Sequence, residues 1–109
     1  MVEIFKALSE ESRLRILSLL LDREMCVCEI EFCLEMSQSN ASRHLTVLKQ
    51  CGILDYYKKA QWAYYRINDT FKQENIELWD YLLVKLKQLP TYQLDYEKSK
   101  NCSNDICDK

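Results

Sequence analysis

The chain has 109 residues, 48% of them hydrophobic, with six cysteines and a formal net charge of −2. This length predicts one domain, and because so small a domain buries its apolar surface poorly, a dimer is expected. There is no run of eighteen apolar residues and no signal-peptide pattern, which excludes a membrane-spanning helix and favours a cytoplasmic location with reduced cysteines.

The first half of the chain predicts three short helices in succession. A short helical segment over residues 4–8 precedes a helix that we expect Ser9 to cap, with acidic residues in its first turn. Leucines recur at helical spacing in this second helix. The third helix is predicted over residues 27–35, with Ile30 and Leu34 on its buried face.

The next elements form a helix, a hairpin and a long helix. Ser37 can cap a helix that ends at Gly52, the only glycine in the chain. Aromatic-rich segments 53–57 and 62–67 predict two strands around a polar tip at residues 58–61. An apolar stripe predicts one amphipathic helix over residues 70–89, stopped by Pro90. We therefore expect a domain over residues 1–90, mainly α with a small β-hairpin, and a polar, irregular tail over residues 91–109.

The charge is distributed unevenly along the chain. Residues 37–67 carry five basic residues against one acidic residue, whereas residues 1–36 and 68–109 are both net negative. Nucleic-acid binding needs local positive charge, so this segment is the candidate for contact with phosphates, although basic patches also occur on ordinary solvated surfaces.

Two cysteines one residue apart, Cys26 and Cys28, stand at the start of the third helix. Residues i and i+2 of an ideal helix point about 200° apart, so these thiols cannot share one ion while both lie in regular helix. Ion binding therefore requires Cys26 to stay outside the helix or the first turn to unwind. Because this turn supports the following helix, ion binding is expected to distort the position of that helix.

Five fragments in order resemble the ArsR/SmtB family of metal-sensing winged-helix repressors. They are residues 7–17, the Cys26-Val27-Cys28 pair, residues 37–45, residues 48–54 and Tyr64-Tyr65-Arg66. The resemblance covers residues 4–89 and implies a homodimer of winged helix-turn-helix protomers, joined through the first and last helices, that binds palindromic operator DNA. It also implies release of the operator when a metal or metalloid binds, with Cys26 and Cys28 as thiolate ligands.

The third ligand is where the chain departs from the best-known arsenic sensors, which the resemblance associates with a cysteine at the position of Glu31. Cys33 lies about 140° around the helix from Cys28 and cannot join it unless the helix breaks, so we interpret it as a small buried hydrophobe. Cys51 receives the same interpretation. Cys102 and Cys107 either complete the site by folding back, within or across a dimer, or belong to a tail without a role.

The donor type restricts the ion. Thiolates without nearby histidine favour As(III), Sb(III), Cd or Pb over Mg or Ca. The zinc site that other members of the family have on the last helix needs histidine, and residues 70–89 contain none. Three thiolates suit a pyramidal metalloid, and the cadmium/lead branch takes further cysteines from an N-terminal extension that we do not find here. As(III) or Sb(III) is therefore the favoured inducer, with Cd or Pb as the alternative.

The helix after Ser37 and the hairpin tip supply the candidate DNA contacts. Small polar side chains and one arginine fill the first two turns, the part of a recognition helix that enters the major groove. His44 either contacts a phosphate or packs under the helix, and Ala60 stands where the family often has glycine. The candidate DNA-binding residues are Gln38, Ser39, Asn40, Ser42, Arg43, His44, Lys58, Lys59 and Gln61.

Enzymatic function is not expected. One glycine and one histidine cannot form a glycine-rich phosphate loop or a nucleophile–base pair of the usual kind, and redox dithiols normally use a Cys-x-x-Cys motif. The alternative from another class is a thiol redox switch, in which Cys26 and Cys28 or the tail cysteines are oxidised.

Overall fold

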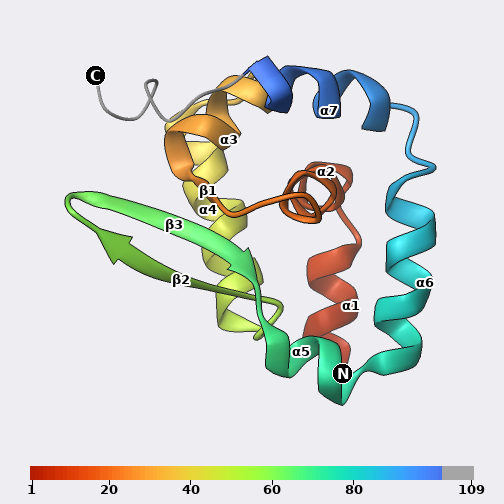
Figure 1. The fold of residues 1–109 in the computed structure, drawn as a ribbon. Coiled ribbons are helices and arrows are strands. Elements are labelled where there is room, and N and C mark those ends of the chain that lie inside the picture. Colours follow the sequence, from red (N-terminus) through yellow and green to blue (C-terminus); the bar gives the residue numbers. More distant parts are fainter. Residues whose placement is uncertain (102–109) are drawn as a thin grey trace.

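The computed structural model describes residues 1–101 and shows a mainly helical body with a small three-stranded antiparallel sheet (Figure 1). No helix in that part of the chain has both the length and the apolar character needed to cross a bilayer. The elements in chain order are α1 (Val2–Leu8), α2 (Glu11–Leu20), β1 (Met25–Cys26), α3 (Val27–Leu34), α4 (Gln38–Gln50), β2 (Leu54–Lys59), β3 (Trp62–Ile67), α5 (Asp69–Glu74), α6 (Ile76–Leu86) and α7 (Tyr92–Asn101).

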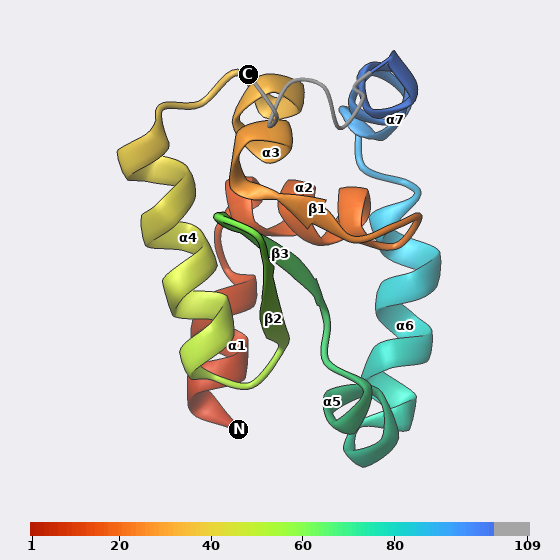
Figure 2. The same cartoon turned by 60° about the vertical axis from the view of Figure 1, so that its left-hand side comes forward.

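The core forms around α2, which the other helices surround in both views (Figures 1 and 2). Burial of these apolar side chains is the main driving force for folding, at about 25 cal/mol per Å². α3 and α4 then pack against each other as the helix-turn-helix. Fully buried side chains include Ile16 and Leu17 of α2, Ile30 of α3, Leu45 and Leu48 of α4, and Leu86 of α6.

The predicted helix after Ser37 is confirmed at both ends. The Ser37 hydroxyl accepts the backbone N–H of Asn40 at 3.2 Å, a hydrogen bond that satisfies one of the free donors of the first turn. Cys51 caps the other end, and Gly52 follows with φ +88°, a left-handed conformation that glycine adopts at little cost.

The predicted hairpin is also confirmed, and it projects from the body as the wing (Figure 1). Lys59 pairs with Trp62, so Ala60 and Gln61 alone form the turn. Ala60 has φ +58°, and its Cβ makes this left-handed conformation unfavourable, at a typical cost of 1–2 kcal/mol. The wing tip therefore keeps a glycine-type conformation without a glycine.

Three details of the sequence prediction were wrong. Ser9 ends α1, donating its hydroxyl proton to the carbonyl of Lys6, while Glu10 is the N-cap of α2. The single helix expected over residues 70–89 is divided at Asn75, whose φ of −134° and ψ of 53° interrupt the helix between α5 and α6. Met25 and Cys26 form an unpredicted strand, β1, on the outer side of β3.

The expectation of an irregular tail was wrong for residues 92–101, which form α7 and pack on α2 and α3. In Figure 1 α7 lies across one end of the body, next to α3. The two buried residues of α7 are Asp95 and Ser99, both polar. A search for apolar helical periodicity cannot detect such a helix.

Candidate functional site

The Cys26–Cys28 pair lies where β1 passes into α3. Cys26 is the last residue of β1 and the N-cap of α3, with an extended backbone and 1% of its surface exposed. Cys28 lies in the first turn of α3, half-buried, with a free thiol. Of the two arrangements that allow a shared ion, the chain therefore adopts the one with Cys26 outside the helix.

Cys26 also belongs to the sheet of the wing. It pairs with Tyr64 of β3, and Met25 pairs with Tyr65, so β1 is an edge strand of the same sheet as the hairpin. Any movement of Cys26 therefore acts on the wing through β3 and on α4 through α3. The sequence predicted only the second of these two connections.

Glu29 fixes the turn that carries the thiols. Its carboxylate accepts the backbone N–H of Cys26 at 3.1 Å, as in a capping box, and the side chain is fully buried. A buried carboxylate needs a counter-charge, which Arg23 provides at 2.8 Å. Arg23 also donates to the backbone carbonyl of Ser99 at 3.2 Å, so one guanidinium joins the thiol-bearing turn to α7.

Two further ion pairs attach α7. Arg15 of α2 donates two hydrogen bonds, of 2.8 and 2.9 Å, to the buried carboxylate of Asp95, and this contact raises the pKa of Arg15. Lys98 lies 2.8 Å from Glu35, the left-handed residue that ends α3, and the hydrogen bond from Lys98 lowers the pKa of Glu35. Polar contacts thus attach α7 to α2 and, directly or through Arg23, to both ends of α3.

The other cysteines have separate positions. Cys33 is fully buried within the continuous helix α3, and Cys51 donates its thiol proton to the carbonyl of Leu48 at 3.4 Å. Cys102 and Cys107 lie outside the described residues. Among residues 1–101 no three cysteine, histidine or acidic side chains converge as a metal site. Of the Cys26–Cys28 pair, Cys28 is the one with a free thiol.

Burial and neighbouring acids disfavour the thiolate form of Cys28. Burial has the largest effect, followed by the negative charge of Glu31, and both raise the pKa of the Cys28 thiol. An ion that binds this sulfur must therefore displace a proton.

The candidate DNA-contacting residues lie on α4 and on the wing tip. Lys49 of α4 lies 4.4 Å from the ring centre of Tyr56 in β2, a cation–π contact that joins the two elements. Arg66 instead forms ion pairs with Asp55, at 2.8 Å, and with Glu24, at 3.6 Å. Its charge is therefore already paired within the protein. The exposed members of the predicted set are Gln38, Ser39, Asn40, Ser42, Arg43, Lys58, Lys59 and Gln61.

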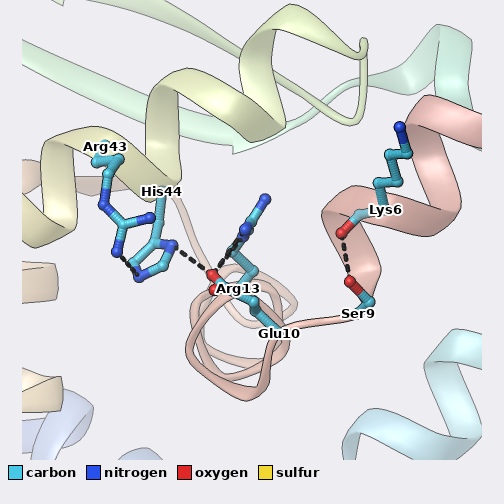
Figure 3. A network of polar contacts seen from close by, with 6 residues as sticks. All are labelled: Lys6, Ser9, Glu10, Arg13, Arg43 and His44. Carbon is cyan, nitrogen blue, oxygen red and sulfur yellow. Dashed lines mark hydrogen bonds and ion pairs between the residues drawn. The ribbon is translucent and has the colours of Figure 1, made fainter.

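His44 is the exception, because only 5% of its surface is exposed. Its ring lies under α4 and faces the N-terminus of α2 (Figure 3). Nδ1 is 3.3 Å from a carboxylate oxygen of Glu10, and Nε2 is 3.5 Å from the guanidinium of Arg43. Of the two sequence-based interpretations, the structure favours packing under the helix over direct contact with a phosphate.

Comparison with known proteins identifies the family. Residues 10–56 match the family model described as "Bacterial regulatory protein, arsR family". The chain belongs to this family. It is 44% identical over 72 residues to the arsenic resistance transcriptional regulator ArsR1 of Pseudomonas putida (64% of this chain, 56% of ArsR1). It is 38% identical over 76 residues to a CadC homologue, a cadmium resistance regulator of Staphylococcus aureus (69% of this chain, 63% of the homologue).

A solved structure of HlyU from Vibrio cholerae superposes with a TM-score of 0.63 at 41% identity, covering 74% of this chain and 88% of HlyU. The fold is therefore the winged helix of the arsR family, and the relatives named here are transcriptional regulators, not enzymes. The chain spans 56 to 63% of the length of the arsenic and cadmium regulators named above.

The sequence missed the residues that hold the thiol-bearing turn in place. The sequence suggested no role for Arg23, Glu29 or Asp95, yet Glu29 and Asp95 are buried. The one available signal was Glu29 at the third position after Cys26, the spacing of a capping box.

Proposed function

We propose that this arsR-family regulator is a cytoplasmic, homodimeric repressor that releases operator DNA when a thiophilic ion binds Cys26, Cys28 and a thiol of the tail. As(III) or Sb(III) is the favoured ion, because three thiolates match their pyramidal coordination. Cd or Pb remains the alternative, and the similarity to both an arsenic and a cadmium regulator leaves both open.

The observation that carries the proposal is the position of Cys26 between β1 and α3. To share an ion, the sulfurs of Cys26 and Cys28 must turn toward each other, whereas Cys26 is buried and paired with Tyr64. A shift of the backbone at Cys26 that accompanies this movement weakens the β1–β3 pairing and the contact between its backbone N–H and Glu29. One binding event thereby disturbs both the wing and the support of α4.

The DNA half of the proposal is supported by the exposed polar face of α4 and by the basic wing tip. Gln38, Ser39, Asn40 and Ser42 offer donors and acceptors to base edges, while Arg43, Lys58 and Lys59 offer charge to phosphates. His44 belongs to the proposal through its support of Arg43. Gln61 lies beside the lysines in the turn of the wing.

The homodimer is supported by exposed apolar side chains on α1 and α6. Phe5 of α1 is 54% exposed, and Tyr81 and Val84 of α6 are 59% and 56% exposed. Exposed apolar side chains that gather on one face commonly mark an interface. An operator with two half-sites about one helical turn apart matches such a dimer.

The test uses a DNA duplex that the protein itself selects from a random-sequence pool under reduced, ion-free conditions. As(III), Sb(III), Cd, Pb and Zn are then compared for release of this duplex. We expect Cys26→Ser and Cys28→Ser to retain DNA binding and to lose the response, and Cys51→Ser, the matched control, to retain both. Failure to select any duplex, or a full response in both serine variants, contradicts the proposal.

The pH dependence tests the thiol chemistry. Because the pKa of Cys28 is raised, its thiol holds a proton at neutral pH, and ion binding must release that proton. The apparent affinity for As(III) is therefore expected to rise with pH up to that pKa. A flat profile between pH 6 and 8.5, measured by competition with a small dithiol, argues against thiolate ligation.

The tail thiols are tested by deleting residues 102–109, which leaves α7 complete. DNA binding is expected to persist, and ion affinity to fall toward that of a two-thiolate site. Unchanged ion affinity in the truncated protein excludes Cys102 and Cys107 as ligands.

A thiol redox switch is the second candidate function. The observation in its favour is that Cys26 and Cys28 lie on either side of the junction between β1 and α3, which oxidation of either sulfur also perturbs. Addition of peroxide under ion-free conditions distinguishes the two functions. Release of DNA by peroxide alone, with no response to the ions, supports the redox switch.

A further inference from the structure

The polar cluster beneath the recognition helix joins the N-terminus of α2 to α4 (Figure 3). One carboxylate oxygen of Glu10 lies 2.6 Å from Arg13 and 3.3 Å from Nδ1 of His44. Nε2 of the same ring lies 3.5 Å from the guanidinium of Arg43. Three charged side chains thus meet around one buried imidazole.

This arrangement determines which nitrogen of neutral His44 holds the proton. Arginine has N–H donors and no acceptor, so Nε2 can approach Arg43 only with a lone pair. The proton of the neutral ring then lies on Nδ1 and faces Glu10. A second proton must go to Nε2, where it meets a donor of like charge, and the contact with Arg43 has to open.

The same side chains border the predicted DNA surface. His44 and Arg43 line a hollow of about 320 Å³ together with Asn40, and both Asn40 and Arg43 are candidate DNA contacts. The other residues around this hollow are Glu10, Glu11, Ser12 and Met36. Arg43 therefore has one face toward His44 and is exposed on the surface where a phosphate would bind.

We propose that His44 is a positioning residue that exchanges Arg43 for a proton, so that DNA binding by this protein takes up a proton at His44. In the free protein the neutral ring holds Arg43 at Nε2. When a DNA phosphate attracts Arg43, Nε2 loses this partner and the repulsion of a nearby cation, while Glu10 continues to face Nδ1. The protonated ring then becomes favourable. This inference rests on the proposed function, because it requires DNA binding.

The electrostatics of the free protein agree with this sequence of events. Burial lowers the pKa of His44 most, Arg43 lowers it further, and Arg13 adds a smaller effect in the same direction, while Glu10 alone raises it. Glu11 is the other titratable group beside the hollow. Loss of the Arg43 contribution and the arrival of a phosphate both raise the pKa. DNA affinity is therefore expected to increase as pH falls through the interval between the bound and the free pKa.

Because His44 is the only histidine in the chain, its Cε1 proton gives a single NMR titration without assignment. The measurement compares reduced, ion-free protein alone and bound to the selected duplex. We expect the titration to move to higher pH on binding. In the free protein, Arg43→Gln should move it to higher pH and Glu10→Gln to lower pH. An unmoved titration in protein that is fully bound to DNA overturns the inference and leaves the proposed function intact.

DNA affinity as a function of pH provides the second measurement. The wild-type log affinity should fall with pH by up to about one unit per pH unit for each protomer bound, which is the limit for one proton. His44→Gln, which cannot titrate, should remove this pH dependence. Lys59→Gln should weaken DNA binding and keep the pH dependence. Equal pH profiles for the wild type and His44→Gln overturn the inference. Absence of DNA binding at every pH contradicts the proposed function itself.

Discussion

The helices α4 and α7 both pack against α2, but by opposite means. α4 buries Ala41, Leu45 and Leu48, none of which has accessible surface. α7 buries Asp95 and Ser99, and its attachments are the ion pairs and the carbonyl contact to Arg15, Arg23 and Glu35. α4 is thus part of the hydrophobic core, whereas α7 is held to the surface of that core by charge.

The difference sets what each helix can do without unfolding the domain. Separating α4 from α2 exposes apolar core, so its loss is expected to accompany global unfolding. Separating α7 returns charged groups to water, where they are well solvated, so α7 can detach alone. A helix that has to detach while the domain stays folded is therefore better attached by ion pairs than by buried apolar side chains.

The largest effect should come from Leu45→Ala in α4. Truncation of a fully buried leucine typically costs 2–5 kcal/mol, and we expect the free energy of unfolding to fall by about that amount in one cooperative transition. Urea denaturation followed by circular dichroism measures it. Thr46→Ala, at the exposed neighbouring position, is the control and should change stability little. Faster hydrogen exchange confined to α4 would contradict the expected difference between α4 and α7.

The next effect is expected for Asp95→Ala in α7. The variant loses a bidentate, charge-assisted contact with Arg15, and hydrogen bonds to charged groups are worth about 1.5–3 kcal/mol. Because Arg15 can reach water once α7 moves, hydrogen exchange should rise in residues 92–101 and remain slow in α2 and α4. Asp80→Ala removes the same charge from an exposed position of α6 and serves as the control. Uniformly faster exchange throughout the domain would contradict a separately attached α7.

A smaller effect distinguishes two residues with left-handed backbones. Ala60 at the wing tip has φ +58° and Glu35 at the end of α3 has φ +53°. Ala60→Gly relieves the strain without losing a contact, so we expect a gain of about 1 kcal/mol or less in the stability of the domain. Glu35→Gly relieves similar strain but loses the ion pair with Lys98, so its gain should be smaller or absent. Thermal unfolding of both variants in parallel measures the difference.

The smallest effect is expected for Lys98→Ala, since its partner Glu35 is exposed and water screens the pair. The pKa of Glu35 is lowered by Lys98, so this contribution is present above the ordinary glutamate pKa and disappears as pH falls through the lowered value. The variant and the wild type should therefore differ slightly at pH 7 and converge as pH falls below the lowered pKa of Glu35. Lys100→Ala, which lacks a carboxylate partner among the described contacts, is the control. A difference that grows at low pH would contradict the role of the pair.

Local signals predicted α4 and the wing well. The cap at Ser37, the glycine at position 52 and the aromatic strands each carry information within a few residues. β1 was missed because a strand of two residues depends on its partner β3, and the break at Asn75 leaves the apolar stripe almost unchanged. α7 was missed because its buried positions hold Asp95 and Ser99, which only the distant Arg15 and Arg23 make favourable.

The sequence located the thiol pair and the polar surface of α4, and the structure adds how they are connected. Because Cys26 and Cys28 are close in sequence, their ligand potential was visible in the chain. Their link to the wing requires the pairing of Cys26 with Tyr64, and the contact of His44 with Glu10 spans 34 positions of the chain. Such contacts between distant segments leave no local pattern.

β1 pairs with β3 through only two residues and lies at the edge of the sheet, opposite β2. Opening it leaves the β2–β3 hairpin and the helical core intact, so the barrier is that of a local fluctuation, on a timescale of microseconds to seconds. For the proposed switch, the response time is then governed by the arrival of the ion and by thiol ligand exchange. Under the proposed function, the protein then leaves its operator without unfolding and binds again once the ion is removed.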